Sequence, residues 1–213
     1  MSLSRYTSKA KIFAAFIAVF SVVASANTAN ATGIYGSSSM KEVGRARPPM
    51  GHVEFCTRLP SECEGTGRKG ARIAMNAVRF DELDRVNRSI NAQIAPVTDI
   101  ELYGVEEHWT YPVDRGDCED YVLLKRRTLI SLGWDASALL VTVVRDLKGA
   151  GHAVLTVATD RGDLVLDNQQ EGVMPWQMTG YEYIKRQSQI SPKDWVYVGP
   201  ARSDVGVAST RSK

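Results

Sequence analysis

The stretch Gly116-Asp117-Cys118-Glu119-Asp120-Tyr121 decides how this chain is interpreted. Apolar residues at helical spacing follow it up to Leu132, and Gly133 is a suitable stop, so we predict a helix from Cys118 to about Leu132. Unpaired N–H groups at the start of a helix favour negative charge, which lowers the pKa of a thiol placed there. Cys118 is therefore a candidate nucleophile.

Two side chains downstream complete a candidate catalytic set. His152 begins one strand pattern, and Asp167 ends the next. Cys, His and Asp in this order suggest a cysteine hydrolase, in which Cys118 attacks, His152 takes and returns the proton, and Asp167 orients the imidazole. The other two histidines, His52 and His108, precede the thiol, and we expect them to be surface or structural residues.

The pairing of two predicted strands decides whether His152 and Asp167 can meet. Short turns join three predicted strands, which makes the sheet antiparallel here; the strands are 138–144, 152–159 and 163–168. A turn at Arg161-Gly162 would leave the two side chains roughly 13 Å apart along the strand. A turn centred at 159–160 or 160–161 would make them opposite or diagonal neighbours on one face, and we predict one of those registers.

The rest of the pattern is that of an α+β protein. An amphipathic helix is predicted from Arg72 to Ile94, and a last strand from Trp195 to Val198. Residues 98–114 are loop-like, and 52–70 are expected to form a stapled loop or a short helix and turn.

The first 31 residues are predicted to be a secretory signal peptide. Three basic residues precede an apolar stretch, and small-residue cleavage sites end at Ala26 and Ala31. The apolar stretch, about 13 residues, is shorter than the roughly 20 needed to span a membrane. We therefore expect an exported, soluble protein, periplasmic or secreted, with no transmembrane anchor after cleavage.

Charge and length limit the possible partners. Cleavage after Ala31 would remove three of the 26 basic residues and none of the 24 acidic ones, which leaves a net charge of −1. No dense basic cluster remains, so we expect no nucleic-acid partner. We predict a flexible lead-in without core residues over 32–51, one domain over 52–200 and a disordered tail over 201–213.

The chain has three cysteines, an odd number for an oxidising compartment. Cys56 and Cys63 lie seven residues apart around a turn, so we pair them as a disulfide. Cys118 then remains a free thiol, which is either a nucleophile or a small buried apolar residue.

Carboxylates surround that thiol, and like charges raise the pKa of a thiolate. Asp117, Glu119 and Asp120 could simply favour the helix macrodipole. Alternatively, Asp117 and Glu119 could bind calcium, a hard cation that prefers oxygen ligands. We expect no organic cofactor.

The motifs resemble those of the bacterial transglutaminase-like cysteine peptidases, which include the LapG-like periplasmic proteases that cut large surface adhesins. The resemblance spans roughly residues 52–188. It is carried by the following motifs: Phe55-Cys56-Thr57-Arg58-Leu59-Pro60 with Cys63, Trp109 with Tyr111-Pro112, Gly116-Asp117-Cys118-Glu119-Asp120-Tyr121, Gly151-His152-Ala153-Val154-Leu155, and Leu166-Asp167-Asn168.

The resemblance implies a papain-like, transglutaminase-like α+β fold, with the nucleophile helix packed on an antiparallel sheet. Cys118, His152 and Asp167 match the triad of the family, and Asp117 and Glu119 match its calcium-binding acidic residues. It also implies a protein or peptide substrate and a membrane receptor that sequesters the enzyme, although the sequence shows no separate receptor-binding signal.

Two other functions share these residues. Amide transfer to an amine, as in transglutaminases, would use the same triad with a different second nucleophile. A catalytically silent binding module on the same fold is the other alternative, and the intact triad argues against it.

Overall fold

The computed structural model describes residues 39–65 and 69–199. They belong to one unit of the chain, Tyr35–Lys213. The predicted signal peptide (1–31) and disordered tail (201–213) lie outside the described residues. Within the described ranges, no helix combines the length and the apolar character needed to cross a membrane.

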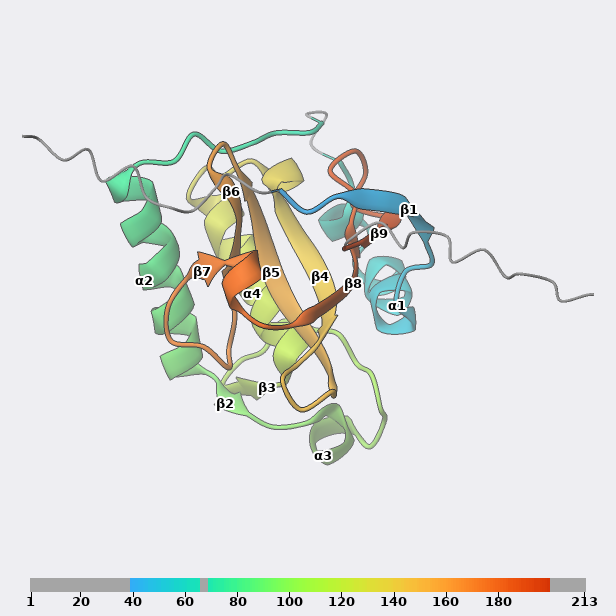
Figure 1. The fold of residues 1–213 in the computed structure, drawn as a ribbon. Helices are drawn as coiled ribbons and strands as arrows, with labels where there is room; N and C mark the ends of the chain where they lie inside the picture. Colours follow the sequence, from blue (N-terminus) through green and yellow to red (C-terminus); the bar gives the residue numbers. More distant parts are fainter. Residues whose placement is uncertain (1–38, 66–68, 200–213) are drawn as a thin grey trace, which may run out of the picture. The chain divides into compact units, whose positions relative to one another are not determined.

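A seven-stranded sheet with the order β1-β9-β8-β4-β5-β6-β7 forms one layer of the fold (Figure 1). All neighbouring strands in it are antiparallel. The strands are β1 (Glu42–Ala46), β4 (Leu139–Arg145), β5 (Gly151–Thr159), β6 (Gly162–Leu166), β7 (Met174–Pro175), β8 (Glu182–Gln187) and β9 (Trp195–Val198). A separate parallel pair joins β2 (Ala95–Pro96) to β3 (Arg115–Gly116).

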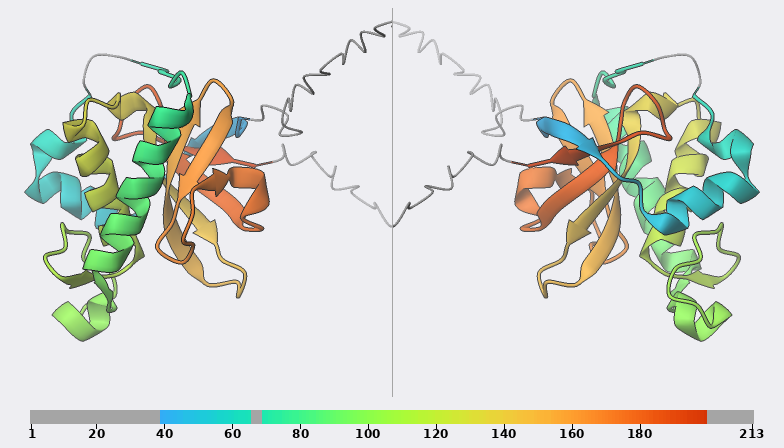
Figure 2. Two further views of the ribbon diagram at one scale, coloured as in Figure 1. Left: turned by 90° about the vertical axis from the view of Figure 1, so that its left-hand side faces the viewer. Right: turned by 90° about the vertical axis from the view of Figure 1, so that its right-hand side faces the viewer.

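Helices form the second layer. The α-helices are α1 (Met50–Arg58), α2 (Ala77–Gln93), α3 (Asp99–Tyr103) and α4 (Cys118–Ser131), and the 3₁₀ helices are η1 (Pro60–Cys63), η2 (Ala136–Ala138) and η3 (Trp176–Met178). Figure 2 shows α1, α2 and α4 on one face of the sheet, whereas α3 lies near β2 and β3 at one end of it (Figure 1). The predicted α+β class, with the helix that begins at Cys118 packed on an antiparallel sheet, is confirmed.

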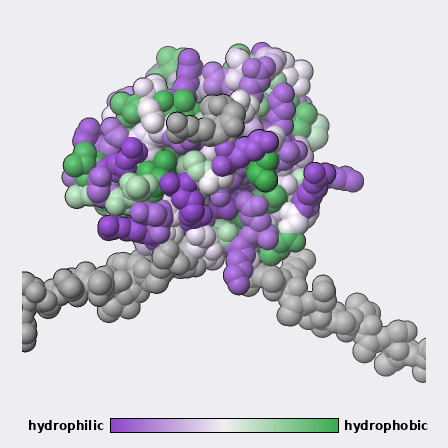
Figure 3. Space-filling model, turned by 90° about the horizontal axis from the view of Figure 1, so that it is seen from above, coloured by the Kyte–Doolittle hydropathy of each residue, from purple (hydrophilic) through white to green (hydrophobic). Residues whose placement is uncertain are grey.

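Apolar side chains cover both faces of the sheet, because successive residues of a strand point to opposite sides. Leu155 of β5 belongs to the larger core, which also contains Leu83 of α2 and Leu129 of α4. Val154, its neighbour in the strand, belongs to a second core on the other face, which includes Tyr181. At the end seen from above in Figure 3, hydrophilic and hydrophobic side chains are mixed.

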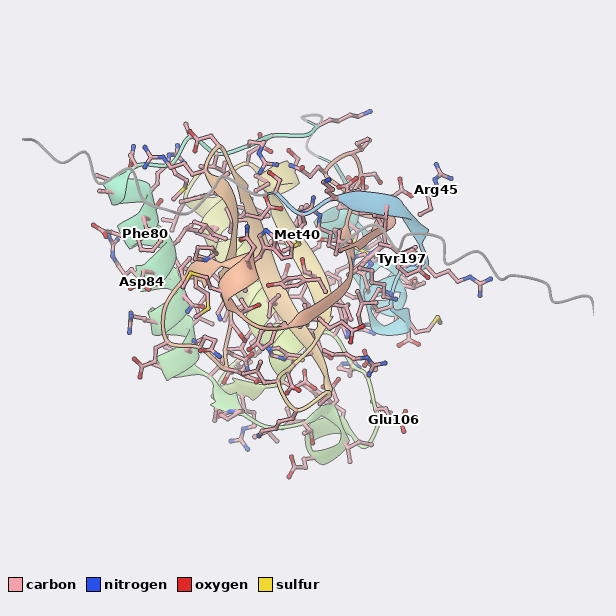
Figure 4. All side chains as sticks on the ribbon, viewed as in Figure 1. Met40, Arg45, Phe80, Asp84, Glu106 and Tyr197 are labelled. Atoms are coloured by element: carbon pink, nitrogen blue, oxygen red, sulfur yellow. A yellow bond between two sulfur atoms is a disulfide. The ribbon has the colours of Figure 1, made fainter. Side chains whose placement is uncertain are left out.

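The expectation that residues 32–51 form a flexible lead-in without core residues is wrong for their described part. Residues 42–46 form edge strand β1, and the Met40 side chain is only 4% exposed. Figure 4 shows Met40 over the sheet. The backbone N–H of Met40 donates to Asp163 at 2.9 Å, and Arg186 donates to the same carboxylate oxygen at 2.9 Å. This buried ion pair fixes the segment, which has no hydrophobic periodicity to reveal it.

The predicted helix over 72–94 begins five residues later than expected. Asn76 caps α2 by accepting a hydrogen bond from the backbone N–H of Arg79 at 2.9 Å. Ile73 instead donates its backbone N–H to Ala158 and extends alongside β5. Both arrangements bury Ile73, so its apolar character did not distinguish a helix from a strand.

The hairpin of β5 and β6 has one of the predicted registers. Thr159 pairs with Gly162, so Asp160 and Arg161 form the turn. This register places Asp167 diagonally across from His152 on the same face. The two side chains can therefore meet beyond the last paired residue of β6.

Candidate active site

Cys118 is the first residue of α4, and its side chain is partly buried. The thiol donates a hydrogen bond to Oε2 of Glu119 at 3.2 Å. Burial and the Glu119 carboxylate raise the pKa of Cys118 well above its ordinary value, and the Ala153 backbone N–H acts in the opposite direction. Burial and this carboxylate therefore outweigh the predicted lowering of the pKa at a helix N-terminus.

His152 and Asp167 form a buried pair beside the thiol. Nε2 of His152 lies 2.8 Å from Oδ1 of Asp167. Burial raises the pKa of Asp167, but hydrogen bonds to its carboxylate outweigh burial, so the net pKa is lowered and the group stays ionised. Because Nε2 is engaged with Asp167, Nδ1 is the ring nitrogen that remains for proton exchange, and the Gln169 amide lies 3.4 Å from it.

The hydrogen bond from Ala153 indicates how close these groups lie. Ala153 directly follows His152 in β5, and its backbone N–H interacts with the Cys118 sulfur. Strand β6 ends at Leu166, so the edge of β5 at Ala153 is not covered by β6, and the start of α4 approaches it there. Cys118, His152 and Asp167 are thus brought to one end of the sheet.

The other histidines do not belong to this group. His52 is buried beside the disulfide, and burial, with a smaller effect of Arg126, lowers its pKa to about 4. The backbone N–H of His108 donates to Asp99, and its ring stacks at a tilt on Tyr103 with centroids 4.4 Å apart. These contacts agree with the structural roles expected for both residues.

Three carboxylates gather next to the thiol. Asp99, Asp117 and Glu119 each offer an oxygen, and these oxygens lie within 4.8 Å of one another. The parallel pair β2–β3 brings these residues together, because parallel strands end at the same edge of their sheet. Asp99 follows β2 and Asp117 follows β3, so both lie at that edge. Asp117 and Glu119 were predicted from the sequence, whereas Asp99 was missed.

Electrostatics in this cluster favour protonation. Burial and then the Asp117 charge raise the pKa of Glu119 to about 9. Burial also raises the pKa of Asp117, to which the charge of Asp99 contributes, although a hydrogen bond with Glu119 lowers it. Buried oxygens Oδ1 of Asp99 and Oδ1 of Asp117 have no hydrogen-bond partner. A hard cation would supply what these oxygens lack, so the donor set fits calcium.

Asp120, the third carboxylate of the motif, has a different environment. Its Oδ1 accepts the backbone N–H of Thr110 at 2.8 Å. A Cβ at Gly116 would lie 2.6 Å from Oδ2 of Asp120, so only glycine allows this close approach. Burial raises the pKa of Asp120 to about 7. Asp120 thus fixes the loop that precedes α4.

The predicted disulfide between Cys56 and Cys63 is present and joins α1 to η1. The disulfide-linked segment α1–η1 contacts the loop that precedes Cys118. Arg58 donates to the Trp109 carbonyl at 2.6 Å, and the Tyr111 hydroxyl donates to Glu62 at 2.7 Å. The short helix and turn expected over 52–70 therefore supports the site.

Comparisons with known proteins give one family match. A family model described as bacterial transglutaminase-like cysteine proteinase BTLCP matches residues 42–203. A search of curated proteins finds no match.

Solved structures of Legionella pneumophila LapG are also similar to this chain. One is 24% identical to this chain, with a TM-score of 0.45. The match covers 53% of this chain and 65% of the LapG chain, which is less than two thirds of it. A calcium-bound structure is 23% identical with a TM-score of 0.49, and the match covers 62% of this chain and 77% of the LapG chain. An EGTA-treated structure is 22% identical with a TM-score of 0.47 and coverage of 61% and 72%.

Proposed function

The chain belongs to the family of bacterial transglutaminase-like cysteine proteinases, and we propose that it hydrolyses peptide bonds with Cys118 as nucleophile, His152 as base and acid, and Asp167 as the residue that orients His152. The observation that carries this proposal is the buried His152–Asp167 pair, at 2.8 Å, next to the residue whose N–H reaches the Cys118 sulfur. A Cys–His pair with an orienting carboxylate is the arrangement that thiol hydrolysis needs.

The proposed reaction has two stages. The Cys118 sulfur attacks the peptide carbonyl carbon as its proton passes to Nδ1 of His152, and the backbone N–H of Cys118 donates to the oxyanion. The C–N bond then breaks, and His152 returns the proton to the departing amine. The acyl group is now a thioester of Cys118, and water attacks its carbonyl carbon as His152 takes a proton from the water. The C–S bond then breaks, the acyl part leaves as a carboxylic acid, and His152 returns the proton to the Cys118 sulfur.

Calcium is part of the proposal, on the evidence of the donor set. Asp99, Asp117 and Glu119 would hold the ion, with backbone carbonyls and water completing the six to eight oxygen ligands that calcium takes. The ion would supply positive charge that offsets the carboxylates. This matters for catalysis because the charge of Glu119 contributes to the raised pKa of Cys118.

We further propose that the protein acts after export to the periplasm. The predicted signal peptide supports this location, although it lies outside the described residues. A surface adhesin as substrate and a sequestering membrane receptor rest on the family resemblance alone. Because the buried Met40 and strand β1 belong to the same fold, we propose that the peptidase domain includes them.

The test is the rate of Cys118 alkylation by iodoacetamide against pH, measured with calcium and with EGTA. In calcium, we expect a reactive plateau that extends well below the ordinary thiol pKa of about 8.5. His152→Ala should abolish the plateau, whereas the control His108→Ala should keep it. An ordinary thiol profile in the parent protein under every condition would refute the proposed activation of Cys118.

A further inference from the structure

Tyr181 lies between η3 and β8, and its side chain contacts two of the three proposed triad residues. Its hydroxyl donates a hydrogen bond to Oδ2 of Asp167 at 2.6 Å. Its ring packs against the His152 ring in an edge-to-face arrangement, with centroids 5.9 Å apart. We propose that Tyr181 is a positioning residue, which holds the Asp167 carboxylate in the orientation that keeps His152 in place. This inference rests on the proposed function of the triad.

The two carboxylate oxygens of Asp167 have separate partners. Oδ1 interacts with Nε2 of His152 and accepts the backbone N–H of Gln169 at 2.9 Å. Oδ2 accepts the Tyr181 hydroxyl. Asp167 is 1% exposed, so without this hydroxyl Oδ2 would be a buried anionic oxygen with a lost partner. The carboxylate would then turn toward another donor, and the His152 ring would lose its fixed partner.

The phenol is suited to be a permanent donor. Burial, followed by the hydrogen bond to Asp167, raises the pKa of Tyr181 to about 12, so its hydroxyl keeps its proton over the range in which a histidine titrates. Lys125 of α4 is another buried titratable group near Asp167. Burial lowers the pKa of Lys125 to about 7, although the Asp167 charge acts in the opposite direction. The neutral hydroxyl adds no charge of its own to this group.

The chain before Tyr181 fixes the direction of its side chain. The hydroxyl of Thr179 donates to the Trp176 carbonyl at 2.9 Å and accepts the backbone N–H of Tyr181 at 3.2 Å. Gly180, with φ of +72°, reverses the chain between them, a conformation that favours glycine. This corner directs the phenol toward Asp167.

Tyr183 provides a matched control. It lies two residues further along, belongs to the same core and is 9% exposed, against 8% for Tyr181. Its hydroxyl contacts the Thr179 hydroxyl at 3.0 Å and the Trp176 carbonyl at 3.2 Å, so it does not hold Asp167. Tyr183→Phe removes the same group from the same core as Tyr181→Phe.

The experiment measures iodoacetamide alkylation of Cys118 from about pH 5 to about pH 9, with calcium present. Tyr181→Phe should lower the rate near pH 6 about tenfold and move the acidic limb of the profile upward, because one hydrogen bond to a charged group is lost. Tyr183→Phe should stay within about twofold of the parent. In an Asp167→Asn background, adding Tyr181→Phe should change the rate less than about twofold, since the two residues act through one contact.

Four results would overturn the inference. A parent-like profile for Tyr181→Phe, with alkylation lost in His152→Ala, would refute the role of Tyr181 and leave the proposed function intact. Equal effects of Tyr181→Phe and Tyr183→Phe, or an undiminished effect in the Asp167→Asn background, would assign Tyr181 a merely structural role. A parent-like profile for His152→Ala would refute the proposed function itself, and the inference with it.

Discussion

Glu119→Gln should reduce the fall in stability with rising pH in the calcium-free protein. Burial and the Asp117 charge raise the pKa of Glu119 from 4.5 to about 9. The folded protein therefore keeps a proton that the unfolded chain releases above pH 4.5. Stability from this group is complete below the unfolded pKa and is lost as the pH rises toward the folded pKa.

The magnitude follows from the size of the shift. At about 1.4 kcal/mol per pH unit, Glu119 alone lowers the free energy of unfolding by about 3 kcal/mol between pH 4.5 and pH 7. By pH 9 the loss reaches about 6 kcal/mol. Burial is the larger cause of this shift, and Coulomb repulsion adds to it. Carboxylate oxygens that lie within 4.8 Å of one another repel by at least about 3 kcal/mol at an effective dielectric constant of about 20.

The assay is urea unfolding in EGTA at several pH values, with Glu106→Gln as the control. Glu106 is an exposed residue near α3, so its replacement should preserve the fall in stability (Figure 4). Asp120, whose pKa burial raises to about 7, contributes its own fall in every protein, and the comparison with Glu119→Gln cancels it. An equal fall in Glu119→Gln and in the parent would refute the assignment. Calcium should flatten the profile of the parent by binding the ionised carboxylates.

Three further outcomes can be measured directly. Cys118→Ser should abolish hydrolysis and leave the free energy of unfolding within about 1 to 2 kcal/mol of the parent in thermal denaturation. Cys56→Ser should lower the free energy of unfolding by about 2 to 3 kcal/mol in oxidising buffer, and in a reductant the variant and the parent should be equally stable. An unchanged melting temperature in oxidising buffer would show that the disulfide does not stabilise the fold. In Gly116→Ala the new Cβ would lie 2.6 Å from Oδ2 of Asp120, so this variant should destabilise the fold by about 1 to 3 kcal/mol. In Gly151→Ala the new Cβ enters open space, so the stability should hardly change.

Local constraints explain which parts of the fold could be predicted from the sequence. The diagonal placement of His152 and Asp167 follows from strand alternation and a two-residue turn, both of which leave a sequence pattern. The C-terminal end of α4 follows from Gly133, whose φ is +88°. Met40 and β1 left no such pattern, because a buried ion pair of Asp163 with Arg186 fixes that segment.

Asp99 could not be found in this way, because its position depends on a pairing that is too short to recognise. Strands β2 and β3 have two residues each, and β2 includes Pro96. Their parallel arrangement brings Asp99 to Asp117 across 18 residues of sequence, and the Asp99 backbone N–H donates to Asp117 at 3.3 Å. Tyr181 was missed for a similar reason, since the corner at Gly180 that directs it toward Asp167 shows no strand or helix periodicity.

The start of α4 combines two opposing electrostatic effects on one thiol. A helix N-terminus stabilises a nearby anion by about 0.3 to 1 kcal/mol, and by up to about 2 kcal/mol when partly buried. A charged carboxylate next to a buried thiolate destabilises the thiolate by a comparable or larger free energy. Burial, the largest cause, and the Glu119 carboxylate together raise the pKa of the Cys118 thiol, so the helix terminus alone does not activate it. Positive charge among Asp99, Asp117 and Glu119 would offset the contribution of the carboxylates to that raised pKa. On this argument, the proposed calcium ion would control the ionisation of the nucleophile, and the Asp167–Tyr181 contact would control the position of its base.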